Sequence, residues 1–243
     1  MVNGQRAKAS KTKSALTYFF LPYSTIVGVV CTDGIILGTE KIVVNKMMVS
    51  GTDKRAYSIA KEVGCVVNGL VPDGRAMMYR GREEAKQYHD NFGIKIPGHV
   101  LAQRLGNLCQ QNTIYSFRRP YGSSMIMATY DVLNKKPMLW MIEPSGNCYQ
   151  YYGCASGRGR QLARANFEAT KYHETMTVEQ ALPKVAKLLI KSQDEMKEKK
   201  QELELSVLSA GNNWVHKVLD RQTTDAMAAA ALAEIENEDE AMQ

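Results

Sequence analysis

The order of its hydrophobic patterns limits the fold of this chain more than any other feature of the sequence. Four short apolar runs with strand-like alternation lie between Thr25 and Leu70, and two consecutive helical patterns follow up to about Ser116. Strand patterns resume at Ser123, and further helices are predicted after Gly157. Parallel strands need a crossover, usually one helix, between them, so two helices after four strands predict antiparallel sheets.

The first two strands carry the clearest turn signal in the chain. Asp33-Gly34 separates the alternating run 26–30 from the return run 35–38, which residues 42–44 extend, and Asp-Gly between apolar runs favours a tight hairpin. The other strands are predicted at residues 56–59, 63–70, 123–130, 137–142, 148–152 and 202–209, the last as an edge strand with residues 214–216 as its partner.

Capping residues mark the first pair of helices. Asp73 is predicted to cap a helix that continues to about Asn91, where Gly93 would end it. The second helix is predicted at about residues 99–116.

The later helices have their own boundary signals. Thr177 with Gln180 three residues on is a capping-box pattern for the fourth helix. Pro183 lies beyond the first turn and removes a backbone donor, so it predicts a kink or a later start. The last helix is predicted at about residues 220–235, and the densely charged stretch 191–204 is expected to be solvated.

These elements predict an α+β fold, a four-layer αββα sandwich. Each sheet would bury one face on the other sheet and its opposite face under helices. The domain is predicted to span residues 24–235, between an atypical basic tail at 1–23 and an acidic tail at 236–243.

Composition excludes some classes of protein. Hydrophobic residues make up 44% of the 243 residues, enough for a sizeable core, but no run approaches the roughly 18 apolar residues that a membrane span needs. The five cysteines lie far apart with no C-x-x-C spacing, so we expect reduced thiols of an intracellular protein. The apolar run 16–23 follows a basic start but lacks the cleavage site of a secretory signal.

The formal net charge of +6 leaves nucleic-acid binding as an alternative function. Four basic and no acidic residues fall within 1–20, and five acidic and no basic ones within 234–243. Scattered charges without an aromatic-interleaved basic strand are a weak footprint for nucleic acid, so solvated tails are favoured.

No pattern in the chain predicts a cofactor or a metal. Residues 157–160 (Gly-Arg-Gly-Arg) lack the third glycine of a dinucleotide loop and the Gly-Lys-Ser/Thr of a P-loop. The histidines are isolated, without ligand spacing to one another or to a carboxylate: His89, His99, His173 and His216. A turn into a helix and structural histidines are the favoured interpretations.

A set of short motifs nevertheless occurs in an informative order. The motifs are residues 38–41 (GTEK), 53–55 (DKR), 68–75 (NGLVPDGR), 119–122 (RPYG), 143–146 (EPSG) and 155–157 (ASG). In this order the chain resembles the alpha-type subunits of the proteasome core particle. Residues 54–55, 91–93, 202–206 and the acidic tail look most like the subtype called alpha type-3.

This resemblance implies a non-catalytic ring subunit of the 20S proteasome in ubiquitin-dependent protein degradation. Its partners would be six other alpha-type subunits in a heptameric ring, the beta-type ring, and the C-termini of regulatory ATPases or activators, with unfolded substrates passing through. Neither membrane nor nucleic acid is expected as a partner, and the location would be cytoplasm and nucleus. In the family a lysine pairs with the activator's terminal carboxylate, and Arg55, or failing that Lys54, matches that position here. A solvated basic pair in a loop is the alternative interpretation.

The same sandwich is also the fold of hydrolases whose freed N-terminal residue is the nucleophile. Ser24 falls where active beta-type subunits carry a threonine, but it follows Pro22-Tyr23 instead of a glycine. Glu40 matches their aspartate, and Arg55, near their catalytic lysine, would tune a nucleophile poorly because it stays protonated. Cleavage at Gly51-Thr52 would delete the first hairpin. A self-processed hydrolase is therefore the alternative, and no catalytic residue is assigned.

One departure from the family concerns the start of the chain. Alpha-type subunits open with a gate peptide and a first helix, and residues 1–23 match neither. The resemblance therefore covers about residues 24–209.

Overall fold

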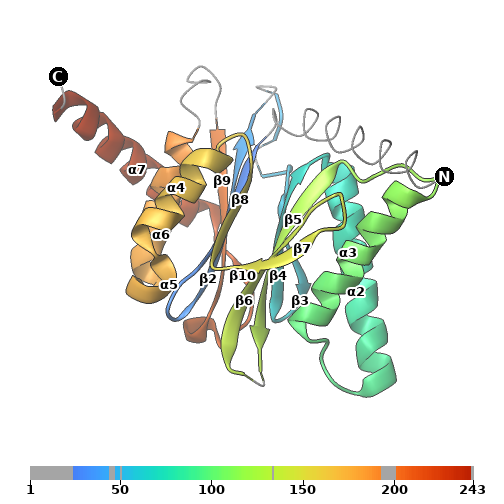
Figure 1. Cartoon of the computed structure of the whole chain (residues 1–243). Coiled ribbons are helices and arrows are strands. Elements are labelled where there is room, and N and C mark those ends of the chain that lie inside the picture. Colours follow the sequence, from blue (N-terminus) through green and yellow to red (C-terminus); the bar gives the residue numbers. More distant parts are fainter. Residues whose placement is uncertain (1–23, 44–46, 50, 133, 193–200, 242–243) are drawn as a thin grey trace.

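The computed structural model describes residues 24–43, 47–49, 51–132, 134–192 and 201–241 (Figure 1). Two five-stranded sheets lie face to face, with strand orders β10-β9-β2-β1-β8 and β3-β4-β5-β6-β7. Every strand pairing is antiparallel. The strands are β1 Thr25–Val30, β2 Gly34–Ile42, β3 Ala56–Ala60, β4 Val63–Gly69, β5 Ser123–Asp131, β6 Lys136–Ile142, β7 Cys148–Tyr151, β8 Gly153–Gly157, β9 Gln201–Ser209 and β10 Lys217–Val218.

Helices cover the outer face of each sheet, which confirms the predicted four-layer αββα sandwich (Figure 1). Within the described residues the helices are α2 Val71–Phe92 and α3 Gly98–Ile114 on one side, and α4 Arg160–Thr170, α5 Tyr172–Thr175, α6 Val178–Lys191 and α7 Arg221–Ala241 on the other, with a short 3-10 turn η2 at Ala210–Asn212. Among the described residues, no helix combines the length and apolar character that a membrane span requires.

The hydrophobic core has three parts, one between the sheets and one under each helical layer. Ile26, Ile126 and Leu139 are fully buried between the sheets. The two sheets approach closely at Gly28, where an added Cβ would lie 2.7 Å from Ile126 and 2.8 Å from Leu139. Strand alternation therefore supplies one apolar face for the central layer and a second for the helices.

One strand was missed by the sequence interpretation. The predicted strand 148–152 is in fact β7, which ends at Tyr151, and the next residues form β8 in the other sheet. β7 pairs with β6, whereas β8 pairs with β1, with Cys154 opposite Gly28. The chain thus passes from one sheet to the other at Tyr152, and the adjacent Gly153 is already the first residue of β8.

The first helix begins earlier than its predicted cap. Leu70 is the N-cap, and Asp73 lies in the first turn, where its carboxylate binds Arg119 and the Gly122 N–H. The prediction of Asp73 as the cap was wrong because Pro72 fits the first turn of a helix and lets it start upstream. The predicted end is confirmed, since Gly93 is left-handed with φ +70°.

The later helices differ from prediction at two points. The capping box is present, and α6 starts directly after Thr177, so the later start inferred from Pro183 was wrong. The last helix continues past Ile235 to Ala241, and the predicted boundary at 235/236 falls inside it. The predicted tail 1–23 and the charged residues 193–200 lie outside the described residues.

His216 joins the two sheets directly before β10. The predicted partner of β9 was residues 214–216, but β10 begins three residues later, at Lys217. His216 Nδ1 lies 2.7 Å from Ser58 Oγ, and its backbone N–H donates to the Lys61 carbonyl at 2.7 Å. The ring packs on Gly64, and its Nε2 has no hydrogen-bond partner among the described residues. Burial lowers the pKa of His216 to about 4.

Protonation of His216 is expected to destabilise the fold in mild acid. The unfolded chain binds this proton below about pH 6.5 and the folded chain only near pH 4, so stability falls between these values, by on the order of 1 kcal/mol at pH 5.5. Urea unfolding at pH 7.5 and 5.5 should show this loss in the natural chain and a smaller one in His216→Gln. An equal loss in both would contradict the assignment.

Candidate functional site

A buried polar cluster lies where β1 begins, around Ser24. The Ser24 hydroxyl donates to Asn68 Oδ1 at 2.7 Å and accepts from Arg55 Nη1 at 2.8 Å. The three residues are 1%, 2% and 8% exposed, respectively. The Asn68 amide does not take up a proton near neutral pH, and arginine stays protonated. The two side chains that contact this hydroxyl therefore hold it in place but cannot act as its general base.

The carboxylate of Glu40 fixes the beginning of β1 to the end of α6. Its Oε1 accepts from Thr25 Oγ1 at 3.1 Å, and its Oε2 accepts from Ser192 Oγ at 3.2 Å. Thr25 Oγ1 in turn accepts the Gly159 N–H at 3.0 Å, at the start of α4. Glu40, which sequence comparison placed at a catalytic aspartate position, thus holds three elements together here.

The glycine-rich turn before α4 is filled by the chain itself. Gly157 has φ +107°, and an added Cβ would lie 2.0 Å from the Ser24 carbonyl oxygen. An added Cβ at Gly159 would lie 2.3 Å from Ser192 Cβ. The space beside these glycines is therefore taken by neighbouring residues, which agrees with a turn into a helix and not with a phosphate loop.

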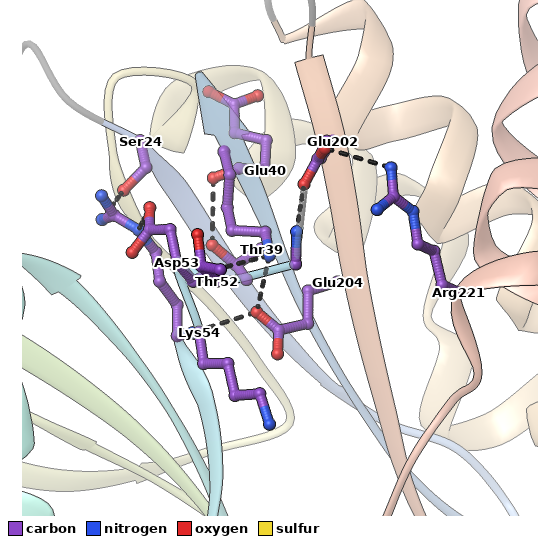
Figure 2. A network of polar contacts seen from close by, with 12 residues as sticks. Ser24, Thr39, Glu40, Thr52, Asp53, Lys54, Glu202, Glu204 and Arg221 are labelled. Atoms are coloured by element: carbon purple, nitrogen blue, oxygen red, sulfur yellow. Dashed lines mark hydrogen bonds and ion pairs between the residues drawn. The ribbon is translucent and has the colours of Figure 1, made fainter. Parts of the chain in front are cut away.

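The two candidate partner-binding residues are adjacent in the loop 51–55, but Arg55 is buried and Lys54 is exposed. Arg55 is bonded to Ser24, and its Nε lies 3.4 Å from Asp53 Oδ2. The side chain of Lys54 extends away from the cluster (Figure 2). Arg55 is therefore occupied internally, and Lys54 is the one of the two that a partner can reach.

The other cations around this loop are paired with carboxylates. Lys41 Nζ lies 3.3 Å from Glu204 Oε2 and donates to the Asp53 carbonyl at 2.7 Å. Arg221 lies 3.2 Å from Glu202. The ammonium of Lys54 makes no ion pair with any residue that the structure describes.

Sequence reasoning missed this network. It expected residues 191–204 to be solvated, but Glu202 is buried on β9. The signal lay in the strand predicted at 202–209, because its alternation places Glu202 and Glu204 on one face.

The other reactive groups of the described residues do not gather into a site. Burial raises the pKa of Cys31, Cys65 and Cys109 to about 12 and that of Cys148 to about 11, and it raises the pKa of Cys154 as well. Within the described part of the chain, histidine, cysteine and carboxylate side chains form no group that could hold a metal ion. The thiols are thus poor nucleophiles.

Comparison with known proteins agrees with the resemblance that the sequence motifs indicated. Residues 24–208 match the family described as "Proteasome subunit". The probable proteasome subunit alpha type-7 of Schizosaccharomyces pombe is 38% identical over 222 residues, 90% of this chain and 87% of the relative. Proteasome subunit alpha type-3 is 39% identical over 210 residues in Spinacia oleracea (86% and 83%) and 36% identical over 213 residues in Dictyostelium discoideum (88% and 85%).

Proposed function

Because the chain belongs to the proteasome subunit family, we propose that it is a non-catalytic alpha-type subunit of the outer ring of the 20S core particle. The observation that carries this proposal is the match to alpha-type subunits along almost the whole chain. In this role the sandwich helps to build the ring and the gate through which unfolded substrates reach the chamber. Cytoplasm and nucleus are the proposed location, which a fluorescent fusion would test.

The surroundings of Ser24 support the absence of catalysis. An N-terminal nucleophile needs a free α-amine and a group that takes the hydroxyl proton. Here the hydroxyl lies between an amide and a guanidinium and is buried. We infer that Ser24 stays within a continuous chain and serves as a packing and hydrogen-bonding residue.

Purification of the tagged chain from native lysate tests this proposal. The chain should co-elute with six other alpha-type subunits and with beta-type subunits, and its mass should show no cleavage before Ser24 or Thr52. A persistently monomeric chain would contradict ring membership. A mature protein that begins at either residue, with hydrolysis abolished by blocking its amine, would support the hydrolase alternative.

We further propose that Lys54 binds the C-terminal carboxylate of a regulatory ATPase or activator subunit. It is exposed and lacks an ion pair with the described residues, while its neighbours Lys41, Arg55 and Arg221 each contact a carboxylate. A charge-assisted contact from an ammonium to a carboxylate is the expected interaction.

Replacing Lys54 with methionine should weaken this docking at least about tenfold, because one charge-assisted hydrogen bond is lost. The measurement is photo-crosslinking of a peptide copied from a regulator's C-terminus to this chain in purified core particles. The peptide with a free carboxylate is compared with its C-terminal amide. Lys86→Met, at an exposed site on α2, is the matched control and should behave like the natural chain.

A further inference from the structure

Two carboxylates of β9 hold both ends of the loop that carries Lys54. Glu202 Oε2 accepts the N–H of Gly51 at 3.4 Å, and Glu204 Oε2 accepts the N–H of Arg55 at 3.0 Å. Residues two apart in a strand share a face, so both carboxylates point toward the loop. Figure 2 shows the loop against this face of β9. We call Glu202 and Glu204 the β9 clamp.

Cations from two other elements hold the β9 clamp itself. Arg221, in the first turn of α7, lies 3.2 Å from Glu202 Oε1 and 3.2 Å from Asp225. Lys41, on β2, lies 3.3 Å from Glu204 Oε2, and its ammonium also donates to the Asp53 carbonyl in the middle of the loop. The side chains of Glu202, Glu204 and Lys41 are largely buried, so solvent and salt screen these contacts less than surface pairs.

From this geometry we propose that Glu202 and Glu204 are positioning residues, which fix the loop Gly51–Arg55 so that Lys54 meets an incoming carboxylate. The inference rests on the proposed function of Lys54. A carboxylate that binds a lysine reduces the conformational entropy of the long, flexible side chain. If the loop that carries the lysine is also mobile, binding reduces the entropy of its backbone as well. A loop already held at Gly51 and Arg55 avoids this entropy loss of the backbone.

The β9 clamp also links the loop 51–55 to α7. Glu202 accepts from Gly51 with one oxygen and pairs with Arg221 through the other. Loss of Arg221 should therefore loosen the loop through Glu202, although the loop and α7 are separated by about 170 residues in the sequence. The expected effect of Arg221→Gln is in the same direction as loss of Glu202 and smaller.

The main test compares Glu202→Ala with Glu202→Gln in core particles that contain the tagged chain. Alanine removes the acceptor of the Gly51 N–H, while the half-exposed Arg221 can return to water, so the fold should survive. Glutamine keeps an oxygen acceptor for the Gly51 N–H and should therefore retain part of the preference for the carboxylate peptide. Glu83→Ala, which breaks an exposed ion pair with Arg80 on α2, is the control.

Two measurements are made on these particles. Hydrogen exchange of the segment that contains residues 51–55 should be about tenfold faster in Glu202→Ala than in the control, since opening of the loop no longer breaks a contact to Glu202. The crosslinking ratio of carboxylate peptide to amide peptide should fall about tenfold toward the value of Lys54→Met. A purely structural role for Glu202 would leave that ratio unchanged in assembled particles.

The outcomes separate the two proposals. If Lys54→Met leaves the carboxylate preference intact, the docking role of Lys54 is wrong. If Lys54→Met removes the preference but Glu202→Ala and Glu204→Ala both keep it, Lys54 binds the peptide and the positioning role of the β9 clamp is wrong. If Glu202→Ala does not assemble, Glu204→Ala, which removes the acceptor of the Arg55 N–H, decides by the same ratio.

Discussion

Replacing Gly157 with alanine is expected to destabilise the fold by about 4 kcal/mol. Its φ of +107° lies in a region that residues with a Cβ rarely adopt. The new Cβ would also lie 2.0 Å from the Ser24 carbonyl oxygen and 2.9 Å from Asn68 Nδ2. Because Gly157 pairs with Thr25 across β1 and β8, the clash is with backbone that cannot move without opening the sheet.

Gly93→Ala is the matched control for this prediction. Gly93 also has a positive φ, of +70°, but nothing lies within 4 Å of its added Cβ. It should therefore show the conformational cost alone, about 1 kcal/mol. Urea unfolding followed by circular dichroism measures both. Similar losses in the two variants would mean that the start of β1 is not held against Gly157 as the structure has it.

How far the sequence could predict the fold depends on whether the signal was local. The Asp33-Gly34 turn and the alternating runs locate their strands because hairpin geometry and a half-buried face act on neighbouring residues. The change of sheet between β7 and β8 depends instead on pairing with β6 and β1. A strand's own periodicity does not say which sheet it joins, so residues 148–157 were predicted incompletely.

The same distinction explains the site. Sequence reasoning placed Arg55 first and Lys54 second as the docking residue. The order is reversed in the structure because Ser24 and Asp53 bind the Arg55 guanidinium. Glu202 was expected to be solvated because a run of charges usually is. It is buried because Gly51 and Arg221 meet it from distant parts of the chain. The alternation of β9 shows that Glu202 and Glu204 share a face, but it does not show which distant residues meet that face.

Asp73→Ala is expected to cost about 3 kcal/mol, the second large effect. Asp73 is only 5% exposed, and its carboxylate accepts from both terminal nitrogens of Arg119 at 2.6 Å and from the buried Gly122 N–H at 2.7 Å. It thereby fixes the segment before β5 to the first turn of α2. Most of the cost is the Gly122 N–H left without an acceptor, because Arg119 is largely exposed and can be hydrated.

The pH dependence of this loss identifies its cause. The hydrogen bonds from Arg119, and then the Gly122 N–H, hold the pKa of Asp73 below its usual value. The ionised carboxylate therefore stabilises the fold fully above about pH 4 to 5, and its contribution declines as the pH falls through the lowered pKa. The difference in unfolding free energy between the natural chain and Asp73→Asn should be constant from pH 7 to 5 and shrink below pH 4.

Comparing the two chains cancels the titration of His216 and of other carboxylates. Glu83→Ala, with its exposed pair, should stay within about 0.5 kcal/mol of the natural chain throughout. A difference between Asp73→Asn and the natural chain that does not depend on pH would show that packing, and not the ionised carboxylate, connects α2 to β5.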